Sequence, residues 1–318
     1  MKRILVTGAT GQIGAELTPA LRRCHGAERV VAAGHRCVPG PGGEAGPRVT
    51  CDVRDRAALE EIVRQYEISA IYHLAALLSA TAEEAPLKAW EVNVGGLLNV
   101  LEIAREYGCA VFLPSSIGAF GPATPKDPAP QTTIQRPTTI YGIGKVTAEL
   151  LGDYYHLKYG VDARGVRFPG LISHSAKPGG GTTDYAVEIF YAALRQRRYT
   201  CYLAPETRLD MMYMDDAIRA TLEVMAADPA RLRHRNAYNI TAMSITPAEL
   251  ATAIRCHIPD FRIDYRIDPV RQAIADSWPH RLDDGVARRD WGWLPAYDLA
   301  AMTGEMLACL AEKRTIPE

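Results

Sequence analysis

The stretch VTGATGQIGAEL, residues 6–17, places Gly8, Gly11 and Gly14 between an apolar run and an amphipathic one. The apolar run predicts a β-strand, and the spacing of apolar residues after the glycines predicts an α-helix. Glycines at this junction allow a tight turn and let the backbone approach a pyrophosphate, which the start of the helix then binds. The residues predicted to contact a dinucleotide here are Gly8, Gly11, Gln12, Ile13 and Gly14.

The alternation of predicted strands and helices continues through the first half of the chain. Strands are predicted at residues 3–8, 30–34, 48–53, 70–76 and 111–116, and helices at residues 13–24, 56–66 and 89–108. This order predicts a parallel sheet covered by helices on both faces, a Rossmann-type doubly wound α/β fold. We expect a dinucleotide-binding domain over residues 1–170 and a smaller substrate-binding domain over residues 171–318, from which segments can cross back to the sheet.

The composition bounds the partners and the location. Among 318 residues, 36 are Lys or Arg and 37 are Asp or Glu, so the formal charge of −1 gives no reason to expect nucleic acid or an anionic membrane as partner. No apolar run is long enough to span a bilayer, and no signal-peptide pattern is visible. The seven cysteines and eight histidines are scattered, which predicts a cytoplasmic protein with reduced thiols and no metal site.

The end of the second predicted strand bears on the choice of dinucleotide. A fold selective for NAD usually has an Asp or Glu here to bind the adenosine ribose, but this chain has Gly34, followed by His35 and Arg36. Arg36 could meet the 2′-phosphate of NADP or lie in a solvated loop, so NADP stays possible beside NAD. Asp52 and Val53, after the third predicted strand, are further expected cofactor contacts.

The stretch TTIYGIGKVTAEL, residues 138–150, places Tyr141 and Lys145 four residues apart on a predicted helix. Positions i and i+4 share a helix face, so the two side chains can point into one site. An ammonium beside a phenol stabilises the phenolate and so favours a base that works near neutral pH. The pair alone is common on ordinary surface helices, and its meaning depends on the rest of the chain.

Five features in a fixed order resemble the extended short-chain dehydrogenase/reductase superfamily: the glycine turn, HLAA (73–76), Asn93, PSSIGAFG (114–121) and the Tyr141/Lys145 pair. Further stretches resemble the short-chain-type L-threonine 3-dehydrogenases over essentially the whole chain. They are AALLSATAE (75–83), RFPGLIS (167–173), PGGGTTDYAVEIFY (178–191), MMYMDDAI (211–218), ADSWP (275–279) and DWGW (290–293).

The resemblance implies oxidation of the C3 hydroxyl of L-threonine to 2-amino-3-oxobutanoate, with hydride transfer to NAD. It implies that Tyr141 is the general base, that Lys145 supports it and holds the nicotinamide ribose, and that Ser116 hydrogen-bonds the substrate hydroxyl. The neighbouring Ser115 could instead face the core or support the turn. The other implied cofactor contacts are Leu74, Ala75, Ala76, Asn93 and Phe168.

A threonine zwitterion needs partners for its carboxylate and its ammonium. Thr182 and Thr183, at an expected helix start, suit the carboxylate, although Thr182 could simply cap that helix. Ser79, in the loop after the fourth predicted strand, is a second candidate contact. Asp184 could face the ammonium or only complement the helix dipole, and Trp278 could line the pocket or belong to the core.

The chain departs from the family pattern at Gly34 and at Phe168, where Tyr is often found. A nucleotide-sugar epimerase or dehydratase shares this scaffold and the Tyr/Lys pair, and a non-catalytic dinucleotide sensor shares the scaffold alone. The helices predicted at residues 88–107 and 140–159 have apolar positions to spare. The resemblance implies that they form a four-helix interface in a homodimer.

Overall fold

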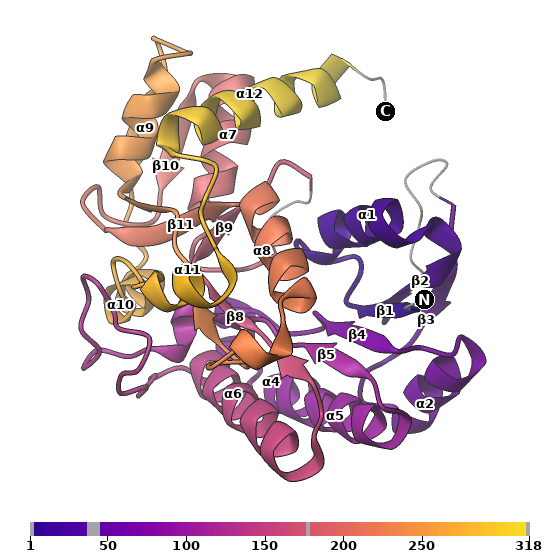
Figure 1. The fold of residues 1–318 in the computed structure, drawn as a ribbon. Helices are drawn as coiled ribbons and strands as arrows, with labels where there is room; N and C mark the ends of the chain where they lie inside the picture. The colour runs from indigo at the N-terminus through magenta and orange to yellow at the C-terminus, as the bar shows by residue number, and fades with distance from the viewer. Residues whose placement is uncertain (1–2, 37–44, 176–178, 316–318) are drawn as a thin grey trace.

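The computed structural model describes residues 3–36, 45–175 and 179–315 (Figure 1). Cys37, and Pro178 at the start of the PGGGTTDY stretch, lie outside the described residues. Within these ranges the chain forms one large sheet, three smaller sheets and the helices that cover them.

Six parallel strands form the central sheet in the order β3-β2-β1-β4-β5-β7. Their bounds are β1 Ile4–Thr7, β2 Val30–Gly34, β3 Arg48–Thr50, β4 Ala70–His73, β5 Ala110–Phe112 and β7 Ala163–Arg164. Strand order changes direction between β1 and β4, and such switch points are where α/β folds bind dinucleotides. The predicted Rossmann-type fold is confirmed.

Helices cover both faces of this sheet. Ile4 and Val6 of β1 pack with α1 (Gly14–His25) and α8 (Met214–Ala226), whereas Leu5 packs with α2 (Arg56–Gln65), α5 (Gly96–Tyr107) and α6 (Ile140–Tyr159). Successive residues of a strand face opposite sides, so burial of both sides explains the unbroken apolar sequence of the strands. Because α8 packs beside α1, a segment late in the chain helps to cover the sheet. The domain division at residue 170 stays a prediction.

The predicted strand at residues 111–116 is divided between two sheets. β5 ends at Phe112, and β6 (Ser115–Ser116) pairs instead with β8 (Val166–Phe168), which also pairs with β12 (Tyr238–Asn239). Pro114 lies between β5 and β6, and a proline has no N–H to donate to a strand ladder. The break turns Ser115 and Ser116 away from the central sheet and into the second one.

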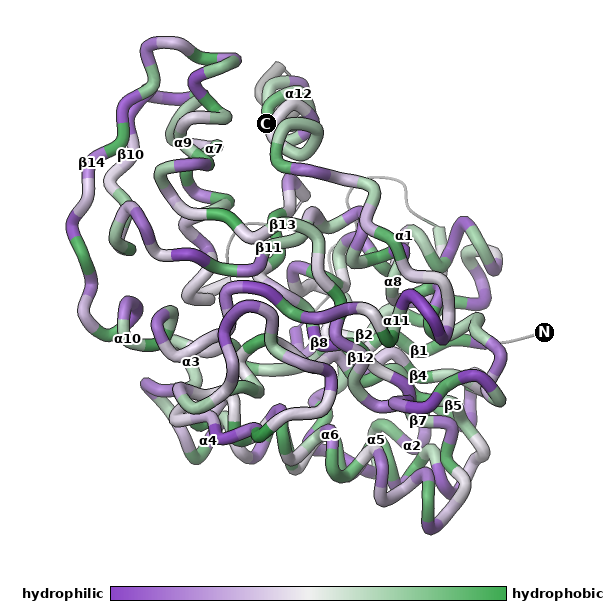
Figure 2. The backbone as a smooth tube through the Cα atoms, turned by 60° about the vertical axis from the view of Figure 1, so that its left-hand side comes forward, coloured by the Kyte–Doolittle hydropathy of each residue, from purple (hydrophilic) through white to green (hydrophobic). Residues whose placement is uncertain are grey.

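The part of the chain after β8 builds a separate layer. β9 (Gly170–Ile172), β11 (Leu209–Tyr213) and β13 (Met243–Ile245) form a sheet, in which β11 and β13 lie side by side in Figure 2. β10 (Arg198–Cys201) pairs with β14 (Arg262–Tyr265). α7 (Tyr185–Gln196), α9 (Pro247–Arg255) and α12 (Leu299–Thr315) pack together at the top of Figure 1. Shorter helices are α3 Ser79–Glu84, α4 Pro86–Trp90, α10 Pro269–Ser277 and α11 Gly285–Trp291, with 3-10 turns η1 Ala27–Arg29, η3 Ile117–Ala119 and η4 Pro229–Arg231.

The helix predicted at residues 89–108 has an irregular start. α4 continues through a π-helical turn, η2 (Glu91–Gly95), directly into α5. A π turn widens the helix by one residue and re-aims the side chains within it, and such turns often occur at functional sites. Asn93 lies in this turn.

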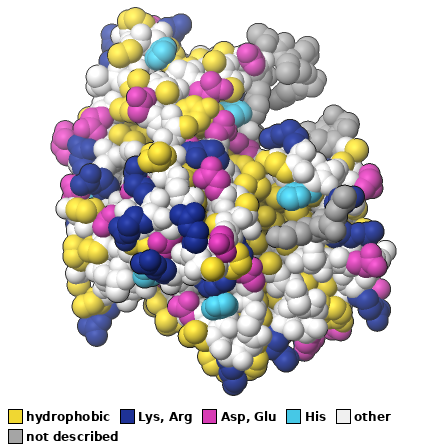
Figure 3. All heavy atoms as spheres, in the orientation of Figure 1, with side chains coloured by type: hydrophobic (Ala, Val, Ile, Leu, Met, Phe, Trp, Pro, Cys, Tyr) yellow, Lys and Arg dark blue, Asp and Glu magenta, His cyan; other side chains and the backbone are white. Residues whose placement is uncertain are grey.

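The surface carries charges of both signs. On the face shown in Figure 3, positive and negative side chains are interspersed. None of the helices within the described ranges is long and apolar enough to cross a membrane. In the same part of the chain, no group of three or more His, Cys, Asp or Glu side chains could hold a metal ion.

Candidate functional site

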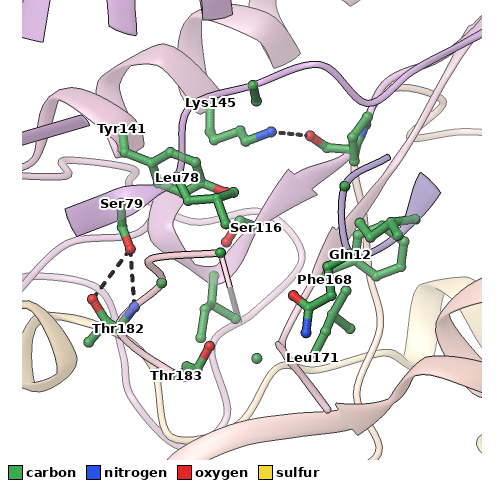
Figure 4. Close-up of a pocket in the computed structure, with 18 of the residues that line it drawn as sticks. Gln12, Leu78, Ser79, Ser116, Tyr141, Lys145, Phe168, Leu171, Thr182 and Thr183 are labelled. Atoms are coloured by element: carbon green, nitrogen blue, oxygen red, sulfur yellow. Dashed lines mark hydrogen bonds between the residues drawn. The ribbon is translucent and has the colours of Figure 1, made fainter. Parts of the chain in front are cut away.

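A cavity of about 310 Å³ lies beyond the carboxyl ends of β1, β4 and β5, where the glycine turn meets the start of α6 and the segment before α7. This is a usual size for a ligand site. Figure 4 shows residues from these elements around it. The predicted site residues that line it are Gly8, Gly11, Gln12, Ile13, Gly14, Leu74, Ala76, Ser79, Ser116, Tyr141, Lys145, Phe168, Thr182, Thr183, Asp184 and Trp278.

The glycine turn requires glycine for its own backbone. Gly8 has a φ of +68°, and a Cβ there would lie 2.7 Å from the Ala75 nitrogen. A Cβ on Gly14 would lie 2.3 Å from the Gly8 carbonyl oxygen. The turn is therefore folded closely upon itself and packed against the segment after β4. The glycines of the turn also line the cavity.

The residues after this turn fit a dinucleotide. α1 begins without a side-chain cap, so no side chain competes with a phosphate for its first N–H groups. Gln12 Nε2 is buried without a hydrogen-bond partner, and Gln12 lines the cavity. A buried amide donor without an acceptor is costly, and a polar ligand would supply the acceptor.

Tyr141 and Lys145 share one face of α6, as predicted. The helix starts after Thr139, whose Oγ1 accepts a hydrogen bond from the Gly142 nitrogen at 3.0 Å. Lys145 Nζ lies 5.5 Å from the centroid of the Tyr141 ring and donates to the Pro114 carbonyl oxygen at 2.7 Å. The ammonium is thus tied to the segment that leads into β6.

Ser116 lies close to Tyr141 because η3, which follows Ser116, packs against the start of α6. Ser116 Oγ accepts a hydrogen bond from the Gly118 nitrogen at 3.1 Å. A Cβ on Gly118 would lie 3.0 Å from Tyr141 Cε1 and 3.6 Å from Ser116 Oγ, so phenol and hydroxyl surround this glycine. Gly142 is needed for the same approach, since a Cβ there would lie 2.2 Å from the Gly118 carbonyl oxygen. A Cβ on Gly144 would meet nothing closer than 3.9 Å.

One side of the cavity is built around Ser79 and Thr182. Ser79 is the first residue of α3 rather than a loop residue, and its Oγ lies 3.3 Å from Thr182 Oγ1 (Figure 4). Thr182 does not cap α7, because that helix begins at Tyr185 with Asp184 in the cap position. The Thr182 hydroxyl instead points toward Ser79 at the start of α3, and both residues line the cavity.

Asp184 and Trp278 both line the cavity and also contact other parts of the protein. Asp184 Oδ2 accepts hydrogen bonds from the Gly180 and Gly181 nitrogens, each at 2.8 Å, and burial raises the pKa of this carboxyl. Asp184 is the only acidic side chain among the described residues that line the cavity. Trp278, 4% exposed, both lines the cavity and belongs to the core around α7 and β11, so its two predicted environments coexist.

Asn93 and Ala75 line a second, smaller cavity of about 30 Å³, which Lys145 also lines. Asn93 Nδ2 donates to the Leu77 carbonyl oxygen at 3.0 Å, and Asn93 Oδ1 accepts from the Leu77 nitrogen at 2.8 Å. The side chain re-aimed by the π turn thus holds the segment after β4 in place. Direct contact of Asn93 with a cofactor stays a prediction.

The predicted adenosine contacts lie outside both cavities. Arg36 is exposed, and Gly34 at the end of β2 is buried. Asp52 forms an ion pair with Arg54 at 2.6 Å, and hydrogen bonds from Arg54 lower the pKa of Asp52 to about 2. Val53 packs against Gly96. Arg36, Asp52 and Val53 stay predicted contacts of the adenosine end.

His73 is a buried group near the site that the sequence did not single out. Its Nδ1 lies 2.9 Å from Thr7 Oγ1. Burial, together with the positive charge of Lys145, lowers the pKa of His73 to about 3. His73 is therefore neutral at pH 7 and adds no positive charge beside Lys145.

Several lining residues were missed by the sequence interpretation. They are Leu77, Leu78, Thr81, Pro114, Ser115, Ile117, Pro169, Gly170, Leu171, Gly179 and Gly181. Most are chain neighbours of predicted residues, which was the available signal. For Ser115 the sequence predicts a place in the core or in support of the turn, and its hydroxyl donates a hydrogen bond to the buried Glu149 carboxylate.

Comparison with known proteins places these features in a family. A model of the NAD dependent epimerase/dehydratase family matches residues 4–241. An uncharacterised epimerase/dehydratase from Staphylococcus saprophyticus is 53% identical over 315 residues, with 98% of each chain covered.

Solved structures show the same likeness. An L-threonine dehydrogenase from Clostridium difficile is 54% identical, with a TM-score of 0.96 and 98% of each chain covered. A monomeric L-threonine 3-dehydrogenase from a metagenome is 45% identical, with a TM-score of 0.94, covering 98% of this chain and 99% of the other. The chain is therefore an oxidoreductase that belongs to the NAD dependent epimerase/dehydratase family, which is of the extended short-chain dehydrogenase/reductase type that the sequence resembles.

Proposed function

We propose that this enzyme oxidises the C3 hydroxyl of L-threonine to 2-amino-3-oxobutanoate and transfers the hydride to NAD. The observation that carries the proposal is one cavity lined by Tyr141, Lys145 and Ser116 together with the glycine turn and Thr182. Similarity to the L-threonine dehydrogenases over nearly the whole chain supports the same substrate.

The protein's part in the reaction is to hold the alcohol and take its proton. Hydride leaves C3 only as the hydroxyl proton is removed, and the bound dinucleotide supplies the hydride acceptor. The Tyr141 phenolate oxygen accepts the proton, and Ser116 Oγ gives the substrate oxygen a second hydrogen bond. Lys145 stabilises the phenolate as the nearby cation.

The charged groups of L-threonine have partners on the far side of the cavity. Ser79, Thr182 and Thr183 offer hydroxyl donors to the carboxylate. Asp184 offers negative charge to the ammonium and is held by the backbone of Gly180 and Gly181. The proposal assigns dinucleotide binding to residues 1–170 and most of the substrate contacts to residues 171–318.

The cavity suits a small zwitterion better than a nucleotide-sugar. Beyond the glycine turn, which is assigned to the dinucleotide, Lys145 is the only cation among the described residues that line the cavity, and no arginine is present. A nucleoside diphosphate carries negative charge that proteins usually bind with arginine or lysine. This difference favours the dehydrogenase over the epimerase or dehydratase alternative.

We also infer that two copies pair through α4, α5 and α6. These helices expose large apolar side chains: Leu87, Trp90, Leu98, Tyr107, Ile143, Leu150, Tyr154, Leu157 and Tyr159. Exposed apolar patches of this kind usually mark an interface. One of the similar solved structures, the protein from a metagenome, is described as monomeric.

Initial rates of dinucleotide reduction test the proposed reaction. The purified protein is expected to reduce NAD with L-threonine and to leave UDP-sugars unchanged. Turnover of UDP-sugars without oxidation of L-threonine would instead support the epimerase or dehydratase alternative.

The Tyr141→Phe variant tests the assigned base. It is expected to lose turnover while it still binds the dinucleotide in a fluorescence titration, because the ring stays in place and only the phenolic oxygen is removed. A variant that kept most of its activity would show that another group takes the proton.

A further inference from the structure

A buried ion pair lies behind the serine turn. Glu149 on α6 and Arg167 on β8 are 4% and 7% exposed. Arg167 Nε and Nη2 donate to the two carboxylate oxygens of Glu149 at 3.0 and 2.8 Å, a bidentate arrangement. Arg167 Nη1 donates to the Gln131 carbonyl oxygen at 2.9 Å and to Asn239 Oδ1 at 3.0 Å. The pair therefore binds the catalytic helix to β8 and β12.

Two further donors reach the same carboxylate. Ser115 Oγ donates to Glu149 Oε1, and Gln135 Nε2 donates to Glu149 Oε2 at 2.9 Å. Ser115 is the residue before Ser116 in β6, whereas Gln135 lies in the chain between η3 and α6. Successive side chains of a strand point to opposite faces, so Glu149 holds β6 through Ser115 while Ser116 faces the other way.

The spacing on α6 connects this anchor to the proposed base. Tyr141, Lys145 and Glu149 follow one another at intervals of four residues and so share a helix face. Eight residues at a rise of 1.5 Å separate Tyr141 from Glu149 by about 12 Å along the helix. In the β6–β8 register Ser115 pairs with Arg167, so both members of the ion pair contact the serine strand.

Stability alone is a weak reason for this arrangement. Removing two charges from water is costly, and apolar residues of similar volume often stabilise a protein as well as a buried ion pair does. A bidentate pair with its oxygens satisfied does fix the relative position of the elements it joins. Position matters here, because a 1 Å misplacement of a reacting group can cost about 10²-fold in rate.

We propose that the Glu149–Arg167 pair, acting through Ser115, is a positioning device that sets the Ser116 hydroxyl against the Tyr141 phenol. The proposal rests on the proposed function in that it assigns Ser116 and Tyr141 to the reacting alcohol. It makes Glu149 and Arg167 positioning residues that need not touch the substrate.

The first test compares Ser115→Ala with Gln135→Ala. Each variant removes one hydrogen bond to Glu149 and leaves the ion pair intact, but only Ser115 lies in the strand of Ser116. We expect Ser115→Ala to lower kcat with L-threonine by about tenfold or more, since a shift of several tenths of an ångström has that effect. Its thermal unfolding midpoint and dinucleotide Kd are expected to match those of Gln135→Ala, whose kcat stays near the parent value. Equal losses of kcat in the two variants would overturn the proposal.

The second test separates positioning from direct contact, because Ser115 also lines the cavity. If Ser115 acts through Ser116, then Ser115→Ala costs little further kcat in a Ser116→Ala background. Losses that multiply in the double variant would mean that Ser115 acts on the substrate by itself, and the proposal would be wrong.

The third test does not depend on the substrate. Crystal structures of Ser115→Ala and Gln135→Ala are compared with that of the parent for the separation between Ser116 Oγ and the Tyr141 phenolic oxygen. The separation is expected to change only in Ser115→Ala, and an unchanged separation overturns the proposal. If the parent oxidises no L-threonine, the proposed function fails, whereas this comparison still decides whether Glu149 positions Ser116.

Discussion

Replacement of Gly118 by alanine should disturb the reaction without disturbing the fold. The added Cβ would lie 3.0 Å from Tyr141 Cε1 and 3.1 Å from Cδ1, whereas carbon atoms in contact usually lie about 3.5–4.0 Å apart. The ring must therefore move by about 0.5 Å to reach that contact range. Gly118 has no positive φ, so alanine adds no backbone strain.

The expected loss follows from this displacement. A 1 Å misplacement costs about 10²-fold in rate, so 0.5 Å should cost about tenfold in kcat. That loss corresponds to about 1.4 kcal/mol of transition-state stabilisation. Initial rates with saturating L-threonine and NAD measure it, and a titration of dinucleotide binding shows whether the cofactor site is intact.

Gly144→Ala is the matched control. Gly144 lies on the same helix, but a Cβ there meets nothing closer than 3.9 Å. Replacing a glycine within a helix by alanine should stabilise the protein by about 0.5–1 kcal/mol and leave kcat unchanged. If Gly118→Ala were as active as the parent, or if both variants lost activity equally, the placement of Tyr141 beside Ser116 would not govern the rate.

Three further predictions concern pH, assembly and the cofactor. His73 binds a proton near pH 6.5 when unfolded but only near pH 3 when folded, so the free energy of unfolding should fall as pH drops below 6.5, by up to about 1.4 kcal/mol per pH unit. Urea unfolding at pH 7 and pH 5 measures this, and His73→Gln should show a shallower slope. The parent should sediment as a dimer at micromolar concentration and Leu150→Glu as a monomer, and a monomeric parent would contradict the inferred interface. Arg36→Ala should raise the Kd for NADP and leave the Kd for NAD unchanged. Weaker binding of both dinucleotides would show that Arg36 does not act at the 2′-phosphate.

The fold could be predicted because its signals are local. The glycine turn between a strand and a helix, and the apolar strands that follow, each need only a few consecutive residues. The same holds for Tyr141 and Lys145, whose shared face follows from helix geometry alone. The glycine turn and the start of α6 meet at the cavity because parallel strands end at one edge of the sheet, whereas Thr182 reaches it from the segment before α7.

Other features depend on contacts that the sequence does not display. Lys145 donates to the backbone carbonyl of Pro114. Because every residue has a backbone carbonyl, the sequence does not identify this partner. The π turn at Asn93 and the two hydrogen bonds between Asn93 and Leu77 depend on the packing of α5 beside β4. Gly142 is visible in the sequence only as a glycine within a helix, and the Gly118 carbonyl oxygen that fills its Cβ position is brought there by the fold.

Glu149 shows where the physical limit lies. It continues the face of Tyr141 and Lys145 by one more turn, yet a glutamate on a helix is almost never fully buried unless it is paired. Its burial depends on Arg167, which the pairing of β8 with β6 places within reach of the carboxylate. Glu149, one turn beyond Lys145, can therefore be identified as an anchor only together with Arg167 on the neighbouring strand. Neither residue alone carries that information.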